Sequence, residues 1–361
     1  MKLVVLLGGN TPEREVSLRS GAGIGRALID LGHDVTLLDT GTGRILADPE
    51  TARALGQGSV PSGAGAHAEL LDDTGRLIVP GAGTGNVDVY VKSIPRDADL
   101  VFIALHGGDG ENGVLQAVLD LARIRYTGSG VLASAVSMDK SLSKRIFRDL
   151  GIPTPGWIEL EAPADPAAPW RPAIGDDEIR RLGGYPLIVK PNDQGSSVGI
   201  SVVRRADEIL PAIEEARRYG RLVLIESFIE GREVTVAVLD DRAFPVVEII
   251  PEGGWYDYQH KYTAGASRYE VPARLSPDIT ERLLALARAS YRALRCSGIA
   301  RVDFRLAEDG TAHCLEVNTV PGMTETSLVP KAASAAGLSY RDLVRAIVES
   351  APARRAARSN A

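Results

Sequence analysis

The 361-residue chain has little of what several protein classes require. Its two cysteines, Cys296 and Cys314, have no CxxC spacing, so neither a disulfide framework nor a zinc site is expected, and both are predicted to be core residues. No apolar run approaches the length of a membrane span, and the apolar stretch after Met1 is too short for a signal peptide. The 41 Lys and Arg do not outnumber the 47 Asp and Glu, and the net charge is −6. We therefore expect a cytoplasmic protein that binds neither membranes nor nucleic acid through broad positive potential.

Two common nucleotide-binding motifs are also missing. The chain has no Gly-Lys dipeptide, which excludes a Walker A P-loop. The segment Gly21-Ala22-Gly23-Ile24-Gly25 superficially suggests a dinucleotide fingerprint. It falls within a predicted helix, however, and the spacing of its third glycine is wrong, so we reject NAD binding as the primary interpretation.

What is present begins as an α/β unit in a chain long enough for two or three domains. Strands are predicted over residues 2–7 and 34–38 with a helix over 15–31 between them, and a further buried strand over 99–105. The segment 41–85 is rich in Gly, Ala and Thr. We predict an irregular surface excursion there, with a short strand near 76–79.

From residue 186 onward the pattern becomes β-rich, which indicates a second kind of architecture. Strands are predicted over 187–190, 199–203, 222–226, 233–239, 244–250, 300–306 and 312–317, and helices over 139–150, 206–219, 278–295 and 340–349. The Pro/Ala-rich segment 161–172 is predicted to be a surface loop, and the tail 351–361 to be frayed.

The most informative local feature is a pair of strand-like runs, 299–306 and 311–318, joined through Asp309-Gly310. This dipeptide signals a two-residue hairpin turn, and the resulting register places Asp303 opposite Glu316 and Arg301 opposite Asn318 on one face. The other face is assigned Val302, Phe304, Leu315 and Val317.

The two facing carboxylates need a compensating charge. At ~5 Å they would repel by about 3 kcal/mol at an effective dielectric of ~20. A divalent cation would convert that repulsion into attraction, and the oxygen ligands of Asp, Glu and Asn suit magnesium. The alternative is a solvated sheet face on which Arg301 and Arg305 neutralise the acids.

A second candidate site is the small-residue loop between Lys190 and Gly199. Gly195 and Gly199 allow close backbone approach, so successive N–H groups and the Ser196 and Ser197 hydroxyls could surround a triphosphate, with Lys190 adding charge. The alternative is a plain flexible hairpin loop.

Taken together, these segments resemble the ATP-grasp family, and within it the D-alanine:D-alanine ligases, over nearly the whole chain. The resemblance is carried, in order, by Leu7-Gly8-Gly9, Glu13-Arg14-Glu15-Val16-Ser17-Leu18, Ala104-Leu105-His106-Gly107, Tyr126-Thr127-Gly128-Ser129-Gly130, Ser137-Met138-Asp139-Lys140, Lys190 to Gly199, Tyr256-Asp257-Tyr258, Lys261-Tyr262, Arg301-Val302-Asp303, Glu316-Val317-Asn318-Thr319, Pro321-Gly322-Met323-Thr324 and Ser327-Leu328-Val329-Pro330.

The resemblance implies a three-domain fold of α/β and α+β class that clasps ATP between its second and third domains. These are an N-terminal parallel-sheet domain over 1–128 that binds substrate, a β-rich central domain over 129–225, and a β-rich C-terminal domain over 226–361 with the metal and catalytic residues. The protein would be a homodimer whose small-molecule partners are ATP and amino acids.

The same resemblance assigns residues to ATP and magnesium. Phosphates would meet Lys140 and Lys190 under a closing loop containing Gly195, Ser197 and Val198. Adenine would lie at the hinge of Glu226, Phe228 and Ile229, and ribose at Glu233. Asp303, Glu316 and Asn318 would hold two magnesium ions, for which manganese could substitute.

The implied reaction is an ATP-dependent, ADP-forming ligation of two D-alanine molecules for peptidoglycan synthesis. One carboxylate attacks the γ-phosphate to give an acyl phosphate, and the amine of the second substrate then attacks the acyl carbon. Arg301 and the Gly322 backbone N–H resemble the family's oxyanion donors. Glu15 would bind the first ammonium and hydrogen-bond with Ser196 and Tyr262, Lys261 and Ser327 would take the second carboxylate, and His106 would orient the first substrate or relay a proton.

Two departures from the family pattern bear on selectivity. Asn112 stands where the family commonly has Asp, and His260 precedes Lys261 where a small residue is more usual. One alternative is therefore a related ATP-grasp ligase with a different or mixed dipeptide product. Another is a regulatory nucleotide-binding protein without turnover, against which the joint presence of Lys190, Arg301 and the three metal-ligand candidates argues.

Overall fold

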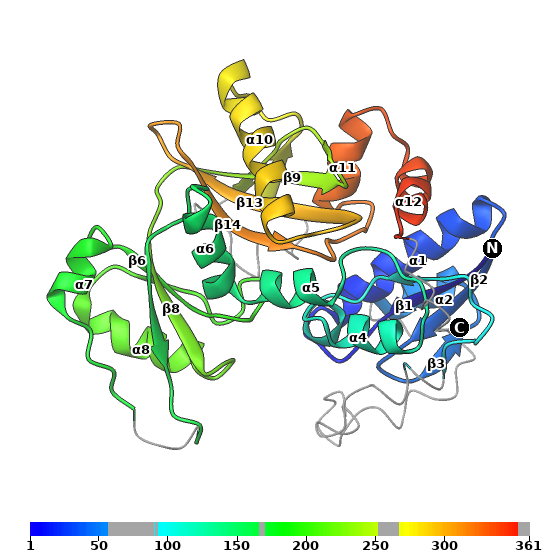
Figure 1. Ribbon diagram of the computed structural model, residues 1–361, viewed down its shortest axis with the longest axis horizontal. Coiled ribbons are helices and arrows are strands. Elements are labelled where there is room, and N and C mark those ends of the chain that lie inside the picture. Colours follow the sequence, from blue (N-terminus) through cyan, green and yellow to red (C-terminus); the bar gives the residue numbers. More distant parts are fainter. Residues whose placement is uncertain (57–89, 91–92, 166–169, 252–266, 353–361) are drawn as a thin grey trace, which may run out of the picture.

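The computed structural model describes residues 1–56, 90, 93–165, 170–251 and 267–352, and the fold in these ranges is built on three β-sheets (Figure 1). The first sheet, in blue and cyan, lies at one end of the molecule and the second, in green, at the other. The third, in yellow-green and orange, lies between them. The order along the sequence, α/β first and β-rich later, is therefore also an order in space.

The first sheet has the strand order β3-β2-β1-β4. Strands β1 (Lys2–Leu7), β2 (Asp34–Asp39) and β4 (Leu100–Ile103) are parallel, and the short β3 (Arg44–Leu46) is an antiparallel edge. Apart from Lys2, every residue of β1 is buried. A continuous apolar run is expected for a parallel strand covered on both faces, and the predicted βαβ beginning is confirmed.

Helix α1 (Arg14–Asp30) packs closely on this sheet because two of its residues lack a side chain. A Cβ added at Gly21 would lie 2.6 Å from the Leu7 Cβ, and one added at Gly25 would lie 2.6 Å from the Leu37 Cδ2. These glycines therefore serve helix–sheet packing, in agreement with the rejection of a dinucleotide fingerprint.

The second sheet is antiparallel, with the order β5-β8-β6-β7. Its strands are β5 (Trp157–Glu161), β6 (Leu187–Pro191), β7 (Ser201–Val203) and β8 (Leu222–Ser227). Helix α8 (Ile209–Ala216) packs its buried Ile209, Ala212 and Ile213 into the core of this unit, and α7 (Asp176–Arg181) borders it. The predicted helix over 206–219 is shorter, because it begins with the 3₁₀ turn η2 (Ala206–Glu208).

The third sheet has the order β12-β11-β9-β13-β14, with β10 (Arg242–Ala243) added to β9. Its strands are β9 (Arg232–Leu239), β11 (Val247–Pro251), β12 (Ser267–Glu270), β13 (Ile299–Leu306) and β14 (Ala312–Asn318). Helix α10 (Pro277–Ala293) covers one face and shares a core with the alternate β13 residues Val302, Phe304 and Leu306. The opposite face of β13 is left for polar side chains.

The β13–β14 hairpin confirms the predicted pairs and corrects the predicted turn. Asp303 lies opposite Glu316 and Arg301 opposite Asn318. The turn is not the expected two-residue type: the Ala307 N–H bonds the Thr311 carbonyl at 2.9 Å, which encloses a three-residue loop. The register shifts between Asp303 and Phe304, so Phe304 pairs with Cys314. This irregularity compensates for the longer loop and restores the predicted pairing at the acids.

The irregularity also moves one side chain to a different environment. Leu315 was assigned to the core face, but it lines a cavity together with Glu316, whereas Cys314 is fully buried in the core beneath α10. Both cysteines are free thiols; Cys296 is half-buried and packs against the same core.

The remaining helices connect the units. They are α2 (Pro49–Gly56), η1 (Gly108–Gly110), α4 (Val114–Leu121), α5 (Val131–Met138), α6 (Lys140–Asp149), α11 (Leu328–Ala335) and α12 (Tyr340–Glu349). Helix α12, shown in red, returns to α1, and its Leu343, Val344 and Ile347 join the core of the first sheet (Figure 1). The C-terminal segment thus holds the segment before α11 against α1.

Part of the excursion predicted for 41–85 is regular. Strand β3 and helix α2 occupy 44–46 and 49–56, so the expectation of irregular structure is wrong there, while the strand predicted near 76–79 and most of the tail 351–361 lie outside the described residues. In the ranges that the structure describes, no helix has the length and apolarity needed to cross a membrane.

Candidate active site

Two adjoining cavities collect most of the predicted site residues. A cavity of about 490 Å³ lies between α1, the third sheet and residues 318–331. A smaller one of about 120 Å³ extends from it between the second and third sheets. Lys140, Gly195, Glu233, Asp303 and Glu316 line both. The larger cavity also has His106, Ser196, Arg301, Asn318, Gly322 and Ser327, and the smaller one Lys190, Ser197, Glu226, Phe228 and Ile229.

The hairpin acids meet cations as well as each other. Arg301 donates from Nε and Nη2 to the two oxygens of Asp303, each at 2.8 Å, and Thr235 Oγ1 donates to Asp303 Oδ1 at 2.5 Å. Lys140 Nζ lies 3.3 Å from Glu316 Oε2. Arg305, the other arginine of the solvated-face alternative, instead lies 3.4 Å from Glu233.

The donor chemistry of the hairpin fits a hard divalent cation. Two carboxylates and the Asn318 amide face one cavity, and oxygen is the ligand type that magnesium prefers. In the described part of the chain no three His, Cys, Asp or Glu side chains cluster as a softer transition-metal site would require. Asp303, Glu316 and Asn318 therefore suit magnesium, with an amide completing the set.

A buried carboxylate joins two lysines at the inner end of the smaller cavity. Glu226 Oε2 lies 2.9 Å from Lys190 Nζ and its Oε1 lies 3.2 Å from Lys144 Nζ, and all three side chains are buried. Burial raises the pKa of Glu226, but the two ammonium groups outweigh it and hold the pKa below its ordinary value. Oε1 is itself buried and faces Lys144, so each oxygen of this carboxylate lies beside an ammonium group.

The loop between β6 and β7 is held in a strained form over this site. Ser196 and Ser197 have φ angles of 50° and 59°, a region that residues other than glycine rarely adopt. Lys140 Nζ donates to the Gln194 carbonyl at 2.6 Å and so ties α6 to the loop. Val198 was predicted to contact ATP but lines neither cavity, and its N–H donates to the Gly195 carbonyl.

The predicted contact between Ser196 and Glu15 is wrong. Ser196 Oγ donates to Glu13 Oε1 at 2.5 Å, and Glu13 lines the larger cavity, whereas Glu15 is exposed and lines neither. Helix α1 begins at Arg14, and two residues correspond to about 200° of helix rotation, so Glu15 points away from the face that carries Val16 and Ser20. The signal was present in the same motif, which holds both acids.

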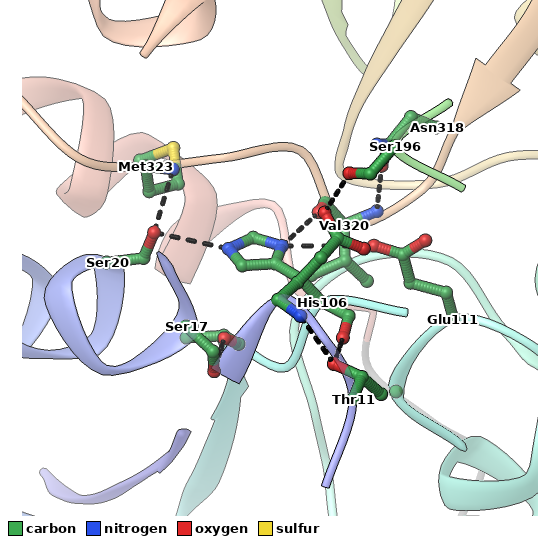
Figure 2. Close-up of polar contacts among 12 residues, drawn as sticks. Thr11, Ser17, Ser20, His106, Glu111, Ser196, Asn318, Val320 and Met323 are labelled. Carbon is green, nitrogen blue, oxygen red and sulfur yellow. Dashed lines mark hydrogen bonds and ion pairs between the residues drawn. The ribbon is translucent and has the colours of Figure 1, made fainter. Parts of the chain in front are cut away.

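His106 is fixed between the first sheet and the segment before α11 (Figure 2). Its Nδ1 donates to the Val320 carbonyl at 2.9 Å, and its Nε2 lies 3.2 Å from Ser20 Oγ, which accepts from the Met323 N–H. Burial lowers the pKa of His106, but the carboxylates of Glu111 and Glu13 outweigh it, so the pKa is raised. The cavity wall therefore carries a buried imidazole that favours its charged form, beside the Glu111 that sequence reasoning missed.

Gly322 and Ser327 come together at the far end of the larger cavity. A Cβ added at Gly322 would lie 2.9 Å from Ser327 Oγ, so a side chain there would displace the serine. Ser327 Oγ accepts from the Thr324 N–H at 3.0 Å. The two other residues predicted near this end, Lys261 and Tyr262, lie outside the described residues, as do Tyr256 to Tyr258 and His260.

Comparison with known proteins gives consistent matches along the chain. Two family models match: "D-ala D-ala ligase N-terminus" over residues 2–129 and "D-ala D-ala ligase C-terminus" over residues 146–349. A D-alanine–D-alanine ligase from Syntrophotalea carbinolica is 41% identical over 354 residues, which cover 98% of this chain and 97% of the relative. One from Gloeobacter violaceus is 38% identical over 352 residues, covering 97% and 99%.

Solved structures agree with the sequence relatives. The D-alanine–D-alanine ligase from Bacillus anthracis superposes with a TM-score of 0.73 at 32% identity, covering 97% of both chains. The structure of that enzyme complexed with ATP gives a TM-score of 0.71 at 30% identity with the same coverage.

Proposed function

The chain belongs to the D-alanine–D-alanine ligase family, and from this premise we propose that it binds ATP and joins two D-alanine molecules into a dipeptide for peptidoglycan synthesis. The observation that carries the proposal is the meeting of three sets of groups in two adjoining cavities. These are the acids of the β13–β14 hairpin, the lysines Lys140 and Lys190, and the Ser196–Glu13 contact that links the loop to α1.

ATP is proposed to occupy the smaller cavity and to extend its phosphates into the larger one. Glu226, Phe228 and Ile229 line this cavity together and are proposed to form the adenine side of the site. Glu233 lines both cavities and is placed to meet the ribose. Lys190 and Lys140 then supply positive charge for the phosphates, under the loop that contains Gly195 and Ser197.

Asp303, Glu316 and Asn318 are proposed to hold magnesium, which when bound would neutralise charge on the ATP phosphates. The chain's own cations are arranged for the same purpose. Arg301 and Lys140 each already meet a hairpin carboxylate, so their positions are fixed before substrate binds.

The first amino acid is proposed to bind beside α1, with Glu13 rather than Glu15 taking its ammonium group. One oxygen of its carboxylate attacks the γ-phosphorus, which forms an O–P bond, breaks the P–O bond to the β-phosphate and so gives an acyl phosphate and ADP. His106, held by Ser20 and Val320, would orient this substrate, since its position is fixed on both ring nitrogens.

The second amino acid is proposed to bind near Ser327, with Lys261 as a further carboxylate ligand. Its amine attacks the acyl carbon, and phosphate leaves after a tetrahedral oxyanion has formed. Arg301 and the Gly322 N–H line the same cavity and are proposed as the donors that stabilise this oxyanion, a contribution that commonly amounts to about 3 kcal/mol per donor.

The test is a product assay. Purified protein with ATP, magnesium and single amino acids or pairs, each in D and L form, is analysed by mass spectrometry for dipeptides and by colorimetry for phosphate. We expect D-alanyl-D-alanine. A mixed or different dipeptide would favour the related-ligase alternative, while Asn112 and His260 are where such selectivity would be sought. ATP binding without any product would favour a regulatory protein.

We further propose that the protein is a cytoplasmic homodimer organised as three domains. The sheets support the division at 128 and 225, except that β8 continues to Ser227, so we place the second boundary after this strand.

The proposed dimer contact lies on two neighbouring helices that carry exposed apolar side chains. These are Val114 and Leu121 on α4 and Val131 and Leu132 on α5, and they suit a contact between copies. Light scattering should give a molar mass of twice the 38.4 kDa chain mass. Leu121→Glu should lower this mass toward that of a single chain, because it places a charge in the proposed contact.

A further inference from the structure

Lys144 is a fully buried ammonium group without a role in the reaction described so far. It lies on α6, one turn after Lys140, and its side chain has no exposed surface. Its Nζ lies 3.2 Å from Glu226 Oε1, donates to Thr154 Oγ1 at 3.0 Å, and sits 5.3 Å from the centre of the Trp157 ring. It lines neither cavity, so it cannot act on a ligand directly.

The surroundings of Lys144 join the two sheets that border the smaller cavity. Glu226 belongs to β8 of the second sheet, while Thr154 Oγ1 donates to the Cys314 carbonyl of β14 in the third sheet at 2.9 Å. A single side chain on α6 therefore contacts one sheet directly and reaches the other through one hydroxyl.

The charge balance of this cluster suggests its purpose. Two buried ammonium groups, from Lys144 and Lys190, share the single carboxylate of Glu226. The cluster carries one net positive charge, and the lysine that borders the cavity is Lys190. With only one lysine, Glu226 would neutralise Lys190 and the cluster would offer no net charge to a phosphate.

We propose that Lys144 is a positioning residue for the nucleotide: by sharing Glu226 it leaves the positive charge of Lys190 available to the ATP phosphates. The inference rests on the proposed ATP site and deepens it. Its consequence is that a side chain with no ligand contact controls phosphate affinity, while adenosine, which has no phosphate, is unaffected.

The protonation of Lys144 gives this role a pH dependence. Burial lowers the pKa of Lys144 to about 8, even though Glu226 acts in the opposite direction. The charged or titratable groups that face it are Glu226 of β8, Lys190 of β6, Cys314 and His313 of β14, and Arg148 of its own helix, which lies over the same Trp157 ring. Above pH 8 the extra positive charge is lost, so phosphate affinity should fall with it.

The experiment measures binding, not turnover. Isothermal titration calorimetry with magnesium and the non-hydrolysable analogue adenylyl-imidodiphosphate compares wild type with Lys144→Met, which keeps the side-chain length and removes the charge. We expect Kd to rise about tenfold in the variant, because one unit charge near a phosphate in a partly buried site is worth about that factor. Adenosine should bind both proteins equally.

Arg145→Met is the matched control. Arg145 is the next residue of α6 and pairs with Glu159 of the second sheet at 2.8 Å, but it is largely exposed and touches neither Glu226 nor the cavities. Loss of this ion pair should leave the Kd of the analogue unchanged. Lys144→Arg, which keeps a permanent charge, should restore at least part of the affinity if it folds, as judged by circular dichroism.

The pH series provides the readout that a purely structural role would not change. Between pH 7 and 9 the wild-type Kd should rise with a midpoint near 8, while the Lys144→Met Kd stays flat. Equal Kd values for the two proteins, or an equal loss of adenosine and analogue binding, would overturn the inference. Failure of the proposed function would look different, since wild type would then yield no dipeptide from D-alanine whatever its nucleotide affinity.

Discussion

Glu13 and Glu15 are two residues apart, yet only Glu13 reaches the cavity. Glu13→Gln should raise KM for the first amino acid and lower kcat/KM by about 10²-fold, because the proposed, partly buried contact to the substrate ammonium group is lost and Ser196 loses its carboxylate acceptor. Glu15→Gln should change kcat/KM less than twofold. Steady-state kinetics with D-alanine checks both variants, and the reverse ranking would return the role to Glu15.

Asp303 is the hairpin acid that accepts from both Arg301 and Thr235. Asp303→Asn keeps the volume but removes the charge, so turnover should fall by about 10²-fold or more and the remaining activity should require higher magnesium concentrations. Glu308→Gln, on the exposed loop of the same hairpin, is the control and should behave as wild type. Magnesium titrations of kcat make the comparison; a normal response of Asp303→Asn would favour the solvated-face alternative.

These residues also indicate how far the sequence can predict a site. Asp303 and Glu316 could be paired from the alternation of two strands, because a strand period of two leaves few registers. The choice between Glu13 and Glu15 depended on where α1 begins, and Lys144 gave no signal at all. Sequence alone does not show whether a lysine is buried or solvated. Lys144 is buried because α6 packs between two sheets, and this packing is visible only in the structure.

Among the elements, those with a regular apolar pattern matched their predictions, whereas several eight-residue helices were not predicted. Helix α12 and strand β1 have the predicted limits, because their apolar patterns are regular and uninterrupted. Helices α4, α5 and α11 were not anticipated; each has only eight residues and is held mainly by tertiary contacts. The hairpin turn was predicted one residue too short, since the bulge that compensates for it leaves no mark in the alternation.

The junction between β8 and β9 depends on one glycine. Gly231 has a φ of 137°, and a Cβ there would lie 2.1 Å from the Leu306 carbonyl oxygen. Gly231→Ala should therefore destabilise the protein by about 2–4 kcal/mol and raise KM for ATP, because Phe228 and Ile229 of the proposed adenine hinge are only two to three residues away.

Gly183→Ala is the control that separates the steric clash expected in Gly231→Ala from the cost of placing a residue other than glycine at a positive φ. Gly183 also has a positive φ, of 92°, but nothing lies within 4 Å of its added Cβ. Its replacement should cost only about 1 kcal/mol and leave KM for ATP unchanged. Urea unfolding and ATP saturation curves of both variants test the pair, and equal destabilisation would show that the contact with Leu306 is relieved at no cost.

At the scale of the whole molecule, the site exists only because all three sheets meet. The first contributes His106, the second Lys190 and Glu226, and the third Asp303 and Glu316, while α12 returns to pack against α1. Sequence patterns locate each sheet separately, but they contain no information on the angle between them. The arrangement of the sheets was instead implied by the resemblance of the ordered motifs to a known family. For this reason the fold could be predicted better than individual contacts.

The whole-molecule consequence of Lys144 is a cost in stability. Its folded pKa of about 8 is lower than the ordinary 10.5, so the unfolded chain binds this proton more tightly between those values. Stability from this group therefore rises with pH from about 8 to 10.5, by roughly 3 kcal/mol in total, and below pH 8 the full penalty remains. Lys144→Met removes the penalty, because Lys190 still pairs with Glu226. At pH 7 the variant should be at least as stable as wild type.

Urea unfolding of wild type and Lys144→Met at pH 7.5 and pH 10 measures this difference directly. Other titrating groups are common to both proteins and cancel, so the advantage of the variant should shrink as the pH rises. If the free energies of unfolding of the two proteins changed in parallel with pH, burial would not lower the pKa of Lys144 in the folded protein. We expect the variant to be more stable than wild type but to bind the ATP analogue more weakly. This combination would show that Lys144 contributes to nucleotide binding and not to the stability of the fold.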